Sequence, residues 1–279
     1  MIVNEKTQQI INQFRKNGRH AFFLDIDGTM IAALAENGVS PRLAKAISDG
    51  RKMGHLFFVN TGRAHGYIPP ALLASAEFDG VVSGLGGHIT YNGKVIHSDF
   101  ITEKTIKRLC EYCEKHGETV LFECETHDEH GGRYSLGDSG FFSVGRDYDK
   151  KEDLYRDIKE NNPIKITVPY VPCEEYAKFL EVEFDMSYIK PIYAEGAYHG
   201  NNKGTAIFKT CDILGIPYEN TVAVGDSAND EKMLSCAGIS VAMGNAPDFI
   251  KEKTTLVCGH VKDDGAAELI EMFIGKESL

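Results

Sequence analysis

Short runs of consecutive apolar residues alternate with amphipathic segments along the N-terminal part of the chain. Residues 21–24 (Ala-Phe-Phe-Leu) and 56–59 (Leu-Phe-Phe-Val) are apolar at every position, which is typical of strands buried on both faces of a parallel sheet. Between them, apolar residues at helical spacing follow Ser40-Pro41 and stop before Gly54, as expected of a helix that begins with a capping serine and a proline. Strand, helix and strand in this order predict a βαβ unit with parallel pairing.

The same alternation returns toward the C-terminal end. Residues 203–214 predict a helix that ends at Gly215. Further buried strands are predicted at residues 81–83, 221–224, 239–243 and 255–257. A short amphipathic helix is expected at residues 5–16, before the first strand, and the sequence leaves open whether it packs on the core or supports a dimer. These elements predict an α/β fold with a doubly wound, Rossmann-like parallel sheet.

The middle of the chain has a different pattern. Ile89-Thr90-Tyr91 and Lys94-Val95-Ile96 flank Asn92-Gly93, which predicts a tight antiparallel hairpin. Helices are expected at 102–116 and 173–182, and strands at 119–125, 141–144 and 164–168. We therefore predict an inserted α+β unit over residues 84–196, with residues 1–83 and 197–279 forming the parallel-sheet unit.

Composition and charge exclude several classes of partner. The 279 residues carry a net charge of −11, which repels nucleic acid and anionic lipid, so neither is expected as a partner. A phosphorylated metabolite would need a local cation to offset this field. No apolar run reaches the roughly 20 residues of a membrane helix, the N-terminus lacks the features of a signal peptide, and seven cysteines show no disulfide framework. A cytoplasmic protein is therefore expected.

Polar side chains follow three of the predicted strands. Asp25, Thr61 and Asp226 come directly after strand ends, and the carboxyl ends of parallel strands line a common crevice. Asp27 and Asp230 add two further carboxylates next to these positions. A cluster rich in carboxylate oxygens suits Mg²⁺ held together with a substrate phosphate.

These segments resemble the four ordered motifs of haloacid-dehalogenase-type phosphatases. The matching stretches are Asp25-Ile26-Asp27-Gly28-Thr29, Thr61-Gly62-Arg63, Lys203-Gly204 and Gly225-Asp226-Ser227-Ala228-Asn229-Asp230. Met243-Gly244-Asn245-Ala246 and Asp263-Asp264-Gly265-Ala266 resemble the Cof-type branch of that family. The resemblance implies a catalytic core with an inserted α/β cap that selects the substrate.

The resemblance also implies a role for each acid. Asp25 would attack phosphorus and form an aspartyl-phosphate, and Asp27 would protonate the leaving alkoxide and then activate water. Mg²⁺ would be bound by the Asp25 carboxylate, the backbone carbonyl of Asp27 and Asp226, with Asp230 binding the metal directly or through its waters. Phosphate contacts are expected from Ile26, Thr61, Gly62, Lys203 and Asn229.

Several features remain open from the sequence. Arg63 either binds substrate or braces the core, and Asn245 either serves the site or sits in an ordinary turn. Cys110, Cys113 and His116 share one face of a predicted helix, which favours a packed helix over a zinc site. Gly84-Leu85-Gly86-Gly87 is interpreted as a hinge, and the loop with His127, His130 and Gly131-Gly132-Arg133-Tyr134 either meets the substrate or is solvated.

The predicted function is hydrolysis of a small phosphorylated metabolite by a Mg²⁺-dependent phosphatase. A sugar phosphate is the first choice of substrate, with nucleotide and cofactor phosphates as others. A phosphomutase on the same scaffold and a non-catalytic protein that binds a phosphometabolite are the alternatives. The sequence does not decide between a monomer and a homodimer.

Overall fold

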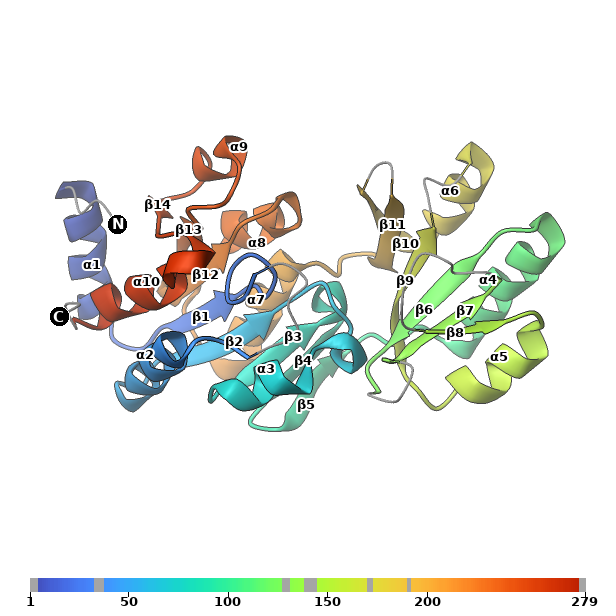
Figure 1. The fold of residues 1–279 in the computed structure, drawn as a ribbon, viewed down its shortest axis with the longest axis horizontal. Helices are drawn as coiled ribbons and strands as arrows, with labels where there is room; N and C mark the ends of the chain where they lie inside the picture. Colours follow the sequence, from blue (N-terminus) through green and yellow to red (C-terminus); the bar gives the residue numbers. More distant parts are fainter. Residues whose placement is uncertain are drawn as a thin grey trace.

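The chain forms two lobes, each built on one β-sheet, in a computed structural model that describes residues 5–32, 38–126, 131–137, 145–169, 173–189 and 192–275 (Figure 1). The strands of the core sheet are β1 (Ala21–Leu24), β2 (Leu56–Asn60), β3 (Gly80–Ser83), β4 (His88–Tyr91), β5 (Lys94–Ser98), β12 (Thr221–Gly225), β13 (Ile239–Ala242) and β14 (Leu256–Val257). The core helices are α1 (Glu5–Lys16), α2 (Pro41–Lys52), α3 (Pro70–Ser75), α7 (Lys203–Leu214), α8 (Glu231–Cys236), α9 (Asp248–Lys251) and α10 (Gly265–Ile274).

The order of the core strands is β14-β13-β12-β1-β2-β3-β4-β5, and the first six of these are parallel. This confirms the predicted doubly wound α/β core. Strand β1 lies between β12 and β2 at the centre of the sheet, where all four of its residues are buried. The helix after it begins as predicted, since the Ser40 side chain accepts a hydrogen bond from the amide of Leu43 and Pro41 occupies the first turn.

The hairpin over residues 88–98 belongs to the core sheet. Strand β4 pairs antiparallel with β3, and β5 pairs with β4, so the hairpin extends the edge of the eight-stranded sheet. The tight turn was correctly predicted, with Asn92 and Gly93 both at positive φ. The boundary that the sequence predicts, at residue 84, assigns this hairpin to the inserted unit instead. The hairpin signal is local and does not specify with which sheet edge the hairpin pairs. We propose that the inserted unit begins near residue 99.

The second lobe is the inserted cap. Its sheet has the order β10-β11-β9-β6-β7-β8, with strands β6 (Val120–Cys124), β7 (Arg133–Leu136), β8 (Arg146–Tyr148), β9 (Pro163–Pro169), β10 (Phe184–Ile189) and β11 (Tyr193–Tyr198). Its helices are α4 (Glu103–His116), α5 (Lys151–Ile158) and α6 (Glu174–Leu180). The expected strand at 141–144 lies outside the described residues.

The two faces of the cap sheet differ in chemistry because side chains alternate along each strand. Phe122, Tyr134 and Ile166 share one face and pack in the apolar cluster with the cap helices. The opposite face carries the buried polar residues Glu123, Arg133, Ser135, Lys165 and Thr167. This face therefore presents charges and hydroxyl groups where a core would present apolar side chains.

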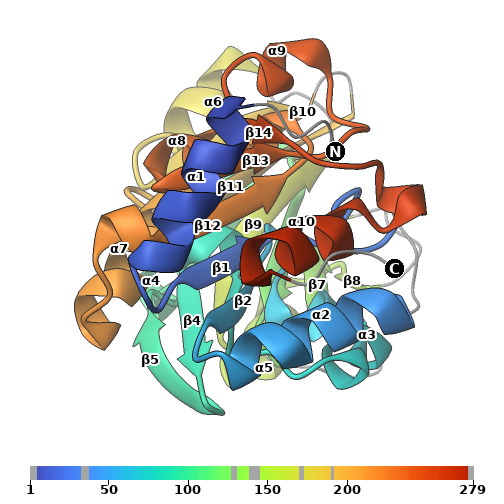
Figure 2. The same cartoon turned by 90° about the vertical axis from the view of Figure 1, so that its left-hand side faces the viewer.

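Helix α1 packs on the core, which is one of the two roles that the sequence leaves open for it. Ile11 and Phe14 are 2% exposed, and the Phe14 ring stacks on His20 with centroids 3.9 Å apart. The Arg15 guanidinium donates to the carbonyl oxygens of Met272 and Phe273 at the end of α10. Figures 1 and 2 show α1 and α10 at the end of the core remote from the cap.

The histidines under α1 should make stability fall at acid pH. The backbone amide of His20 donates a hydrogen bond to Nδ1 of His55. Protonation of that nitrogen would break the bond, because the proton would occupy the lone pair that accepts it. Burial, and then the charge of His20, lowers the pKa of His55 from 6.5 to about 4. Between pH 6.5 and pH 4, His55 is therefore protonated in the unfolded chain but neutral in the folded chain. The free energy of unfolding should decrease as the pH falls from 6.5 to 4 and then level off.

The measurement is the thermal midpoint at several pH values for the wild type and a His55→Gln variant. The glutamine amide oxygen can still accept the His20 hydrogen bond but does not titrate, so the variant should show a shallower fall. His88, whose pKa burial also lowers to about 4, titrates in the same window and remains in both proteins. Equal slopes for the two proteins would contradict the assignment to His55.

Candidate active site

Three strand ends converge on one edge of the core sheet. Leu24 lies opposite Val59 on one side and Val224 on the other, so Asp25 follows β1 in line with the ends of β2 and β12. Thr61 follows β2 and is 1% exposed, and Asp226 follows β12. The sheet thus brings together the three polar positions that the sequence singles out.

Lys203 is the buried cation of this cluster. Its ammonium lies 2.6 Å from an Asp25 carboxylate oxygen and 2.7 Å from one of Asp230, and the residue is 1% exposed. It is the first residue of α7, whose N-terminus is fixed by the Asn202 side chain. The side-chain amide of Asn60 donates a hydrogen bond to the backbone carbonyl of Lys203 at 3.0 Å. Two carboxylates hold the pKa of Lys203 above its usual range despite burial, so the side chain carries a permanent positive charge.

Asp230 fastens the loop after β12. One of its carboxylate oxygens accepts hydrogen bonds from the amides of Asp226 and Ser227, both at 3.0 Å, while the other accepts from Lys203. A side chain at Gly225 would collide with the Asp230 carboxyl group, which explains the glycine at this position. Because both oxygens already accept hydrogen bonds, we propose that Asp230 orients the loop and reaches a metal ion through water.

The acidic cluster has the donor set and the charge of a divalent-cation site. Oxygens of Asp25, Asp226 and Asp230 lie within 4.8 Å of one another. Three carboxylates and the Lys203 ammonium leave two negative charges when all are ionised. Burial, followed by repulsion from Asp230, raises the pKa of Asp25 to about 7 and that of Asp226 to about 6. One divalent cation would balance both charges and favour the ionised acids, so these residues fit Mg²⁺.

Asn245 joins the loops that follow β1 and β12, a role that the sequence does not distinguish from a turn. Its side-chain amide donates to the Gly28 carbonyl at 2.8 Å and to an Asp226 oxygen at 3.1 Å, and its oxygen accepts from the amide of Val261. Gly28 adopts φ +79, and a Cβ there would collide with Asp226. The two acidic loops are therefore packed in direct contact and tied together by one asparagine.

Arg63, in the turn after β2, pairs with Asp27. Its guanidinium donates to both Asp27 oxygens, at 2.7 and 2.9 Å. The Arg63 amide also donates to Thr61 Oγ at 3.2 Å, which fixes the turn after β2. Arg63 thus contacts Asp27, the candidate general acid. The sequence suggests only that Arg63 binds substrate or braces the core, and neither role includes this contact.

The remaining predicted phosphate contacts occupy different positions. Ile26 is fully buried directly after Asp25, and Gly62 is partly buried beside Leu85. Asn229 is exposed, with its side-chain oxygen accepting from Ser227 Oγ at 2.6 Å. Their contacts with a phosphate group stay predictions.

The cysteine motif is part of the cap core. Cys110 and Cys113 are buried on α4, and burial raises the pKa of both thiols, to about 11 at Cys113. His116 stacks on Tyr112 of the same helix. Among the described residues, the side chains grouped closely enough to hold a metal ion are Asp25, Asp226 and Asp230, and not this motif. His127 and His130 lie outside the described residues.

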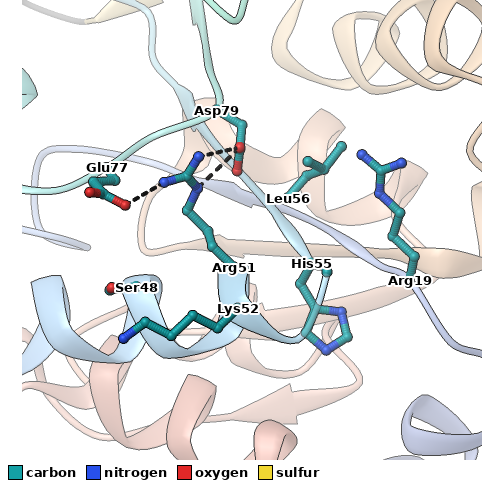
Figure 3. A pocket seen from close by; sticks show the side chains of 9 residues that line it. Arg19, Ser48, Arg51, Lys52, His55, Leu56, Glu77 and Asp79 are labelled. Atoms are coloured by element: carbon teal, nitrogen blue, oxygen red, sulfur yellow. Dashed lines mark hydrogen bonds and ion pairs between the residues drawn. The ribbon is translucent and has the colours of Figure 1, made fainter.

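A cavity of about 580 Å³ opens at the opposite end of the core strands. It is lined by Arg19, Ser48, Arg51, Lys52, Gly54, His55, Leu56, Glu77 and Asp79. Figure 3 shows Arg51 turned toward Glu77 and Asp79, while Arg19 and Lys52 extend in different directions. The positive charges therefore do not converge on one point.

Comparison with known proteins assigns the family. The family model of haloacid dehalogenase-like hydrolases matches residues 22–270. The Bacillus subtilis protein YkrA is 27% identical over 250 residues, covering 89% of this chain and 95% of YkrA. The pyridoxal phosphate phosphatase YbhA of Escherichia coli is 25% identical over 268 residues, covering 88% of this chain and 96% of YbhA.

Solved structures show the same fold. The subclass IIB sugar phosphatase BT4131 of the HAD superfamily superposes with a TM-score of 0.72 at 24% identity, covering 91% of this chain and 98% of that one. Among the residues that the structure describes, no helix is long and apolar enough to cross a bilayer.

Proposed function

Because the chain belongs to the haloacid dehalogenase-like hydrolases and is a phosphatase of that type, we propose that it is a Mg²⁺-dependent phosphomonoester hydrolase that works through an aspartyl-phosphate on Asp25. The observation that supports this most directly is the position of Asp25. Its carboxylate follows the central strand, contacts the buried Lys203 ammonium at 2.6 Å and belongs to a three-acid cluster. A nucleophilic carboxylate needs this kind of charge compensation to meet a phosphate dianion.

The first half-reaction forms a bond from an Asp25 oxygen to phosphorus and breaks the bond from phosphorus to the alkoxide. Asp27 gives its proton to the departing oxygen. In the second half-reaction Asp27 takes a proton from water, the water oxygen attacks phosphorus, and the bond to Asp25 breaks to release phosphate. Lys203 and the Thr61 hydroxyl stabilise charge on the phosphoryl oxygens.

Mg²⁺, when bound, offsets charge on the phosphoryl group and on the nucleophile. Asp25, Asp226 and the backbone carbonyl of Asp27 would hold it, and Asp230 would orient its water ligands. Asn245 serves this site by holding Asp226 and the Gly28 carbonyl in place. None of these residues needs to move far, because hydrogen bonds already fix their loops.

The substrate we propose is a small phosphorylated metabolite, with sugar phosphates as the first class to test. Two of the similar proteins are named a pyridoxal phosphate phosphatase and a sugar phosphatase, which supports a small phosphorylated metabolite as the substrate. Nucleic acid and membranes are not proposed as partners. All seven cysteines lie in the described ranges as free thiols, which supports the proposal of a reducing cytoplasm.

The test is phosphate release from a panel of sugar, nucleotide and cofactor phosphates, with Mg²⁺ and with EDTA. We expect release that requires Mg²⁺, and a ranking by kcat/KM that shows what the cap selects. Folded protein that releases no phosphate from any compound in Mg²⁺ would overturn the proposal in favour of a phosphomutase or a binding protein. Added bisphosphorylated sugar, with isomerisation followed, then separates those two.

A further inference from the structure

The core and the cap touch directly after the Thr61-Gly62-Arg63 motif. The turn η1 (His65–Tyr67) contains Gly66, at which a side chain would collide with the carbonyl oxygen of Thr126 just beyond β6. A side chain at Gly132, in front of β7, would lie 2.7 Å from the same oxygen. The backbones of the two lobes are therefore in contact at this point, so a displacement of the cap would act on η1.

Tyr67 lies at this contact between two arginines from different lobes. The Arg133 guanidinium of the cap lies 3.3 Å from the centre of the Tyr67 ring, and that of Arg63 lies 5.1 Å from it. Arg63 also donates to the Tyr67 carbonyl at 3.4 Å. Stacking of a guanidinium on an aromatic face is favourable, and is stronger where water is excluded.

The cap arginine is itself held in place. Arg133 pairs with Glu123, which also accepts hydrogen bonds from Thr167 at 2.7 Å and pairs with Lys165 at 3.1 Å. Glu123, Arg133 and Lys165 are all at most 6% exposed. A buried and mutually compensated network of this kind has little freedom to rearrange, so Arg133 moves with the cap sheet as one body.

On the core side, Arg63 is the bidentate partner of Asp27. The Arg63 side chain is 12% exposed and that of Asp27 is 32% exposed. A carboxylate with this exposure depends on its hydrogen-bond donors for a fixed orientation. The contacts therefore run without interruption from Glu123 and Arg133 of the cap, through Tyr67 and Arg63, to Asp27.

We propose that Tyr67 is a positioning residue that couples the docked cap to the acid–base group Asp27, an inference that rests on the role of Asp27 in the proposed function. With the cap docked, Arg133 fixes the Tyr67 ring, Tyr67 fixes Arg63, and Arg63 holds the Asp27 carboxyl group in one orientation through both of its oxygens. Displacement of the cap removes Arg133 from the ring and releases this orientation. Proton transfer is thereby confined to the closed enzyme.

The experiment uses the dependence on the leaving group. An alkoxide leaves only with a proton from Asp27, whereas p-nitrophenolate leaves without one. Single-turnover rates with excess enzyme and Mg²⁺ are measured for the best sugar phosphate of the panel and for p-nitrophenyl phosphate. The proteins are the wild type, Asp27→Ala as reference, Tyr67→Leu, and Tyr67→Phe as the matched variant that keeps the ring.

We expect Tyr67→Leu to slow the sugar phosphate about 10- to 100-fold, since a positioned general acid contributes about 10²- to 10⁴-fold and its loss here is partial. Release of p-nitrophenolate should slow by less than about threefold, and Tyr67→Phe should stay close to the wild type on both substrates because it retains the stacking. Arg133→Lys should reproduce the Tyr67→Leu pattern, because an ammonium keeps the charge but not the planar stacking.

Three outcomes would overturn the inference: equal slowing of both substrates in Tyr67→Leu, unchanged rates in that variant, or a Tyr67→Phe variant as slow as Tyr67→Leu. The Asp27→Ala reference distinguishes failure of this inference from failure of the proposed function. If Asp27→Ala slows the sugar phosphate more than p-nitrophenyl phosphate and Tyr67→Leu does not, only the coupling through Tyr67 is disproved. If Asp27→Ala slows both substrates equally, the acid–base role of Asp27 is disproved, and the coupling with it.

Discussion

Replacing Asp25 with asparagine should lower kcat at least about 10⁴-fold, in line with the loss seen when a catalytic nucleophile is removed. The amide keeps the size of the side chain but cannot form an acyl phosphate that water then cleaves. Rates of phosphate release are measured with the best substrate of the panel in Mg²⁺. Acid quenching of the wild type with substrate labelled in the phosphoryl group should trap label on the protein, and the variant should trap none.

Asp248→Asn is the matched control for this change. It makes the same substitution in the core lobe at a side chain that is 93% exposed, so its activity should equal that of the wild type. Thermal unfolding of both variants checks that the core remains folded. An Asp25→Asn protein with near-normal turnover, or one that still traps label, would show that another group is the nucleophile.

The convergence of these candidate site residues could be predicted because it follows from sheet geometry. Asp25, Thr61 and Asp226 each follow an apolar run, and parallel strands place such residues at one edge whatever the loops do. Lys203 was predicted from the motif order, and its position at the start of a helix fixes where its side chain begins. The structure adds that one ammonium serves both Asp25 and Asp230.

The contacts that brace the site could not be predicted, because they depend on loops that meet only in the folded chain. Asn245 and Gly28 are 217 residues apart in sequence, and Arg63 and Asp27 are 36 apart. A local pattern around Asn245 is compatible with any turn. The hairpin at residues 88–98 shows the same limit, since its turn is a local property and its sheet edge is a tertiary one.

Replacing Lys203 with methionine should lower both stability and activity. Methionine fills much of the same volume but leaves Asp25 and Asp230 buried without their cation. Removing one partner of a buried ion pair typically costs about 3–5 kcal/mol of unfolding free energy, and we expect about 3 kcal/mol at pH 8. The kcat/KM should fall about 10³-fold, as it does when a preorganised group that stabilises the transition state is lost. Urea unfolding and phosphate release measure the two effects.

Lys209→Met provides the matched control on the same helix. The Lys209 side chain is 28% exposed and bonds to Asp99, His97 and Asn201, so its loss should cost less than that of the fully buried Lys203, about 1–2 kcal/mol. The cost at Lys203 should also depend on pH. An acid whose pKa is raised by folding stabilises the fold less as pH rises through that pKa. Burial, followed by repulsion from Asp230, already raises the pKa of Asp25 to about 7, and Lys203 opposes that rise. Without Lys203 the pKa of Asp25 should rise further, so the variant should lose less stability at pH 6 than at pH 8.

Mg²⁺ separates a lost charge from lost packing in the Lys203→Met variant. If the ammonium offsets the carboxylates, its removal makes the proposed metal site more negative and should tighten metal binding there. A ligand that binds the folded state raises stability in proportion to the logarithm of its concentration over Kd, so Mg²⁺ should raise the thermal midpoint of the variant more than that of the wild type. An equal or smaller rise would mean that Lys203 acts mainly through packing, and that the negative charge of the three acids is balanced elsewhere.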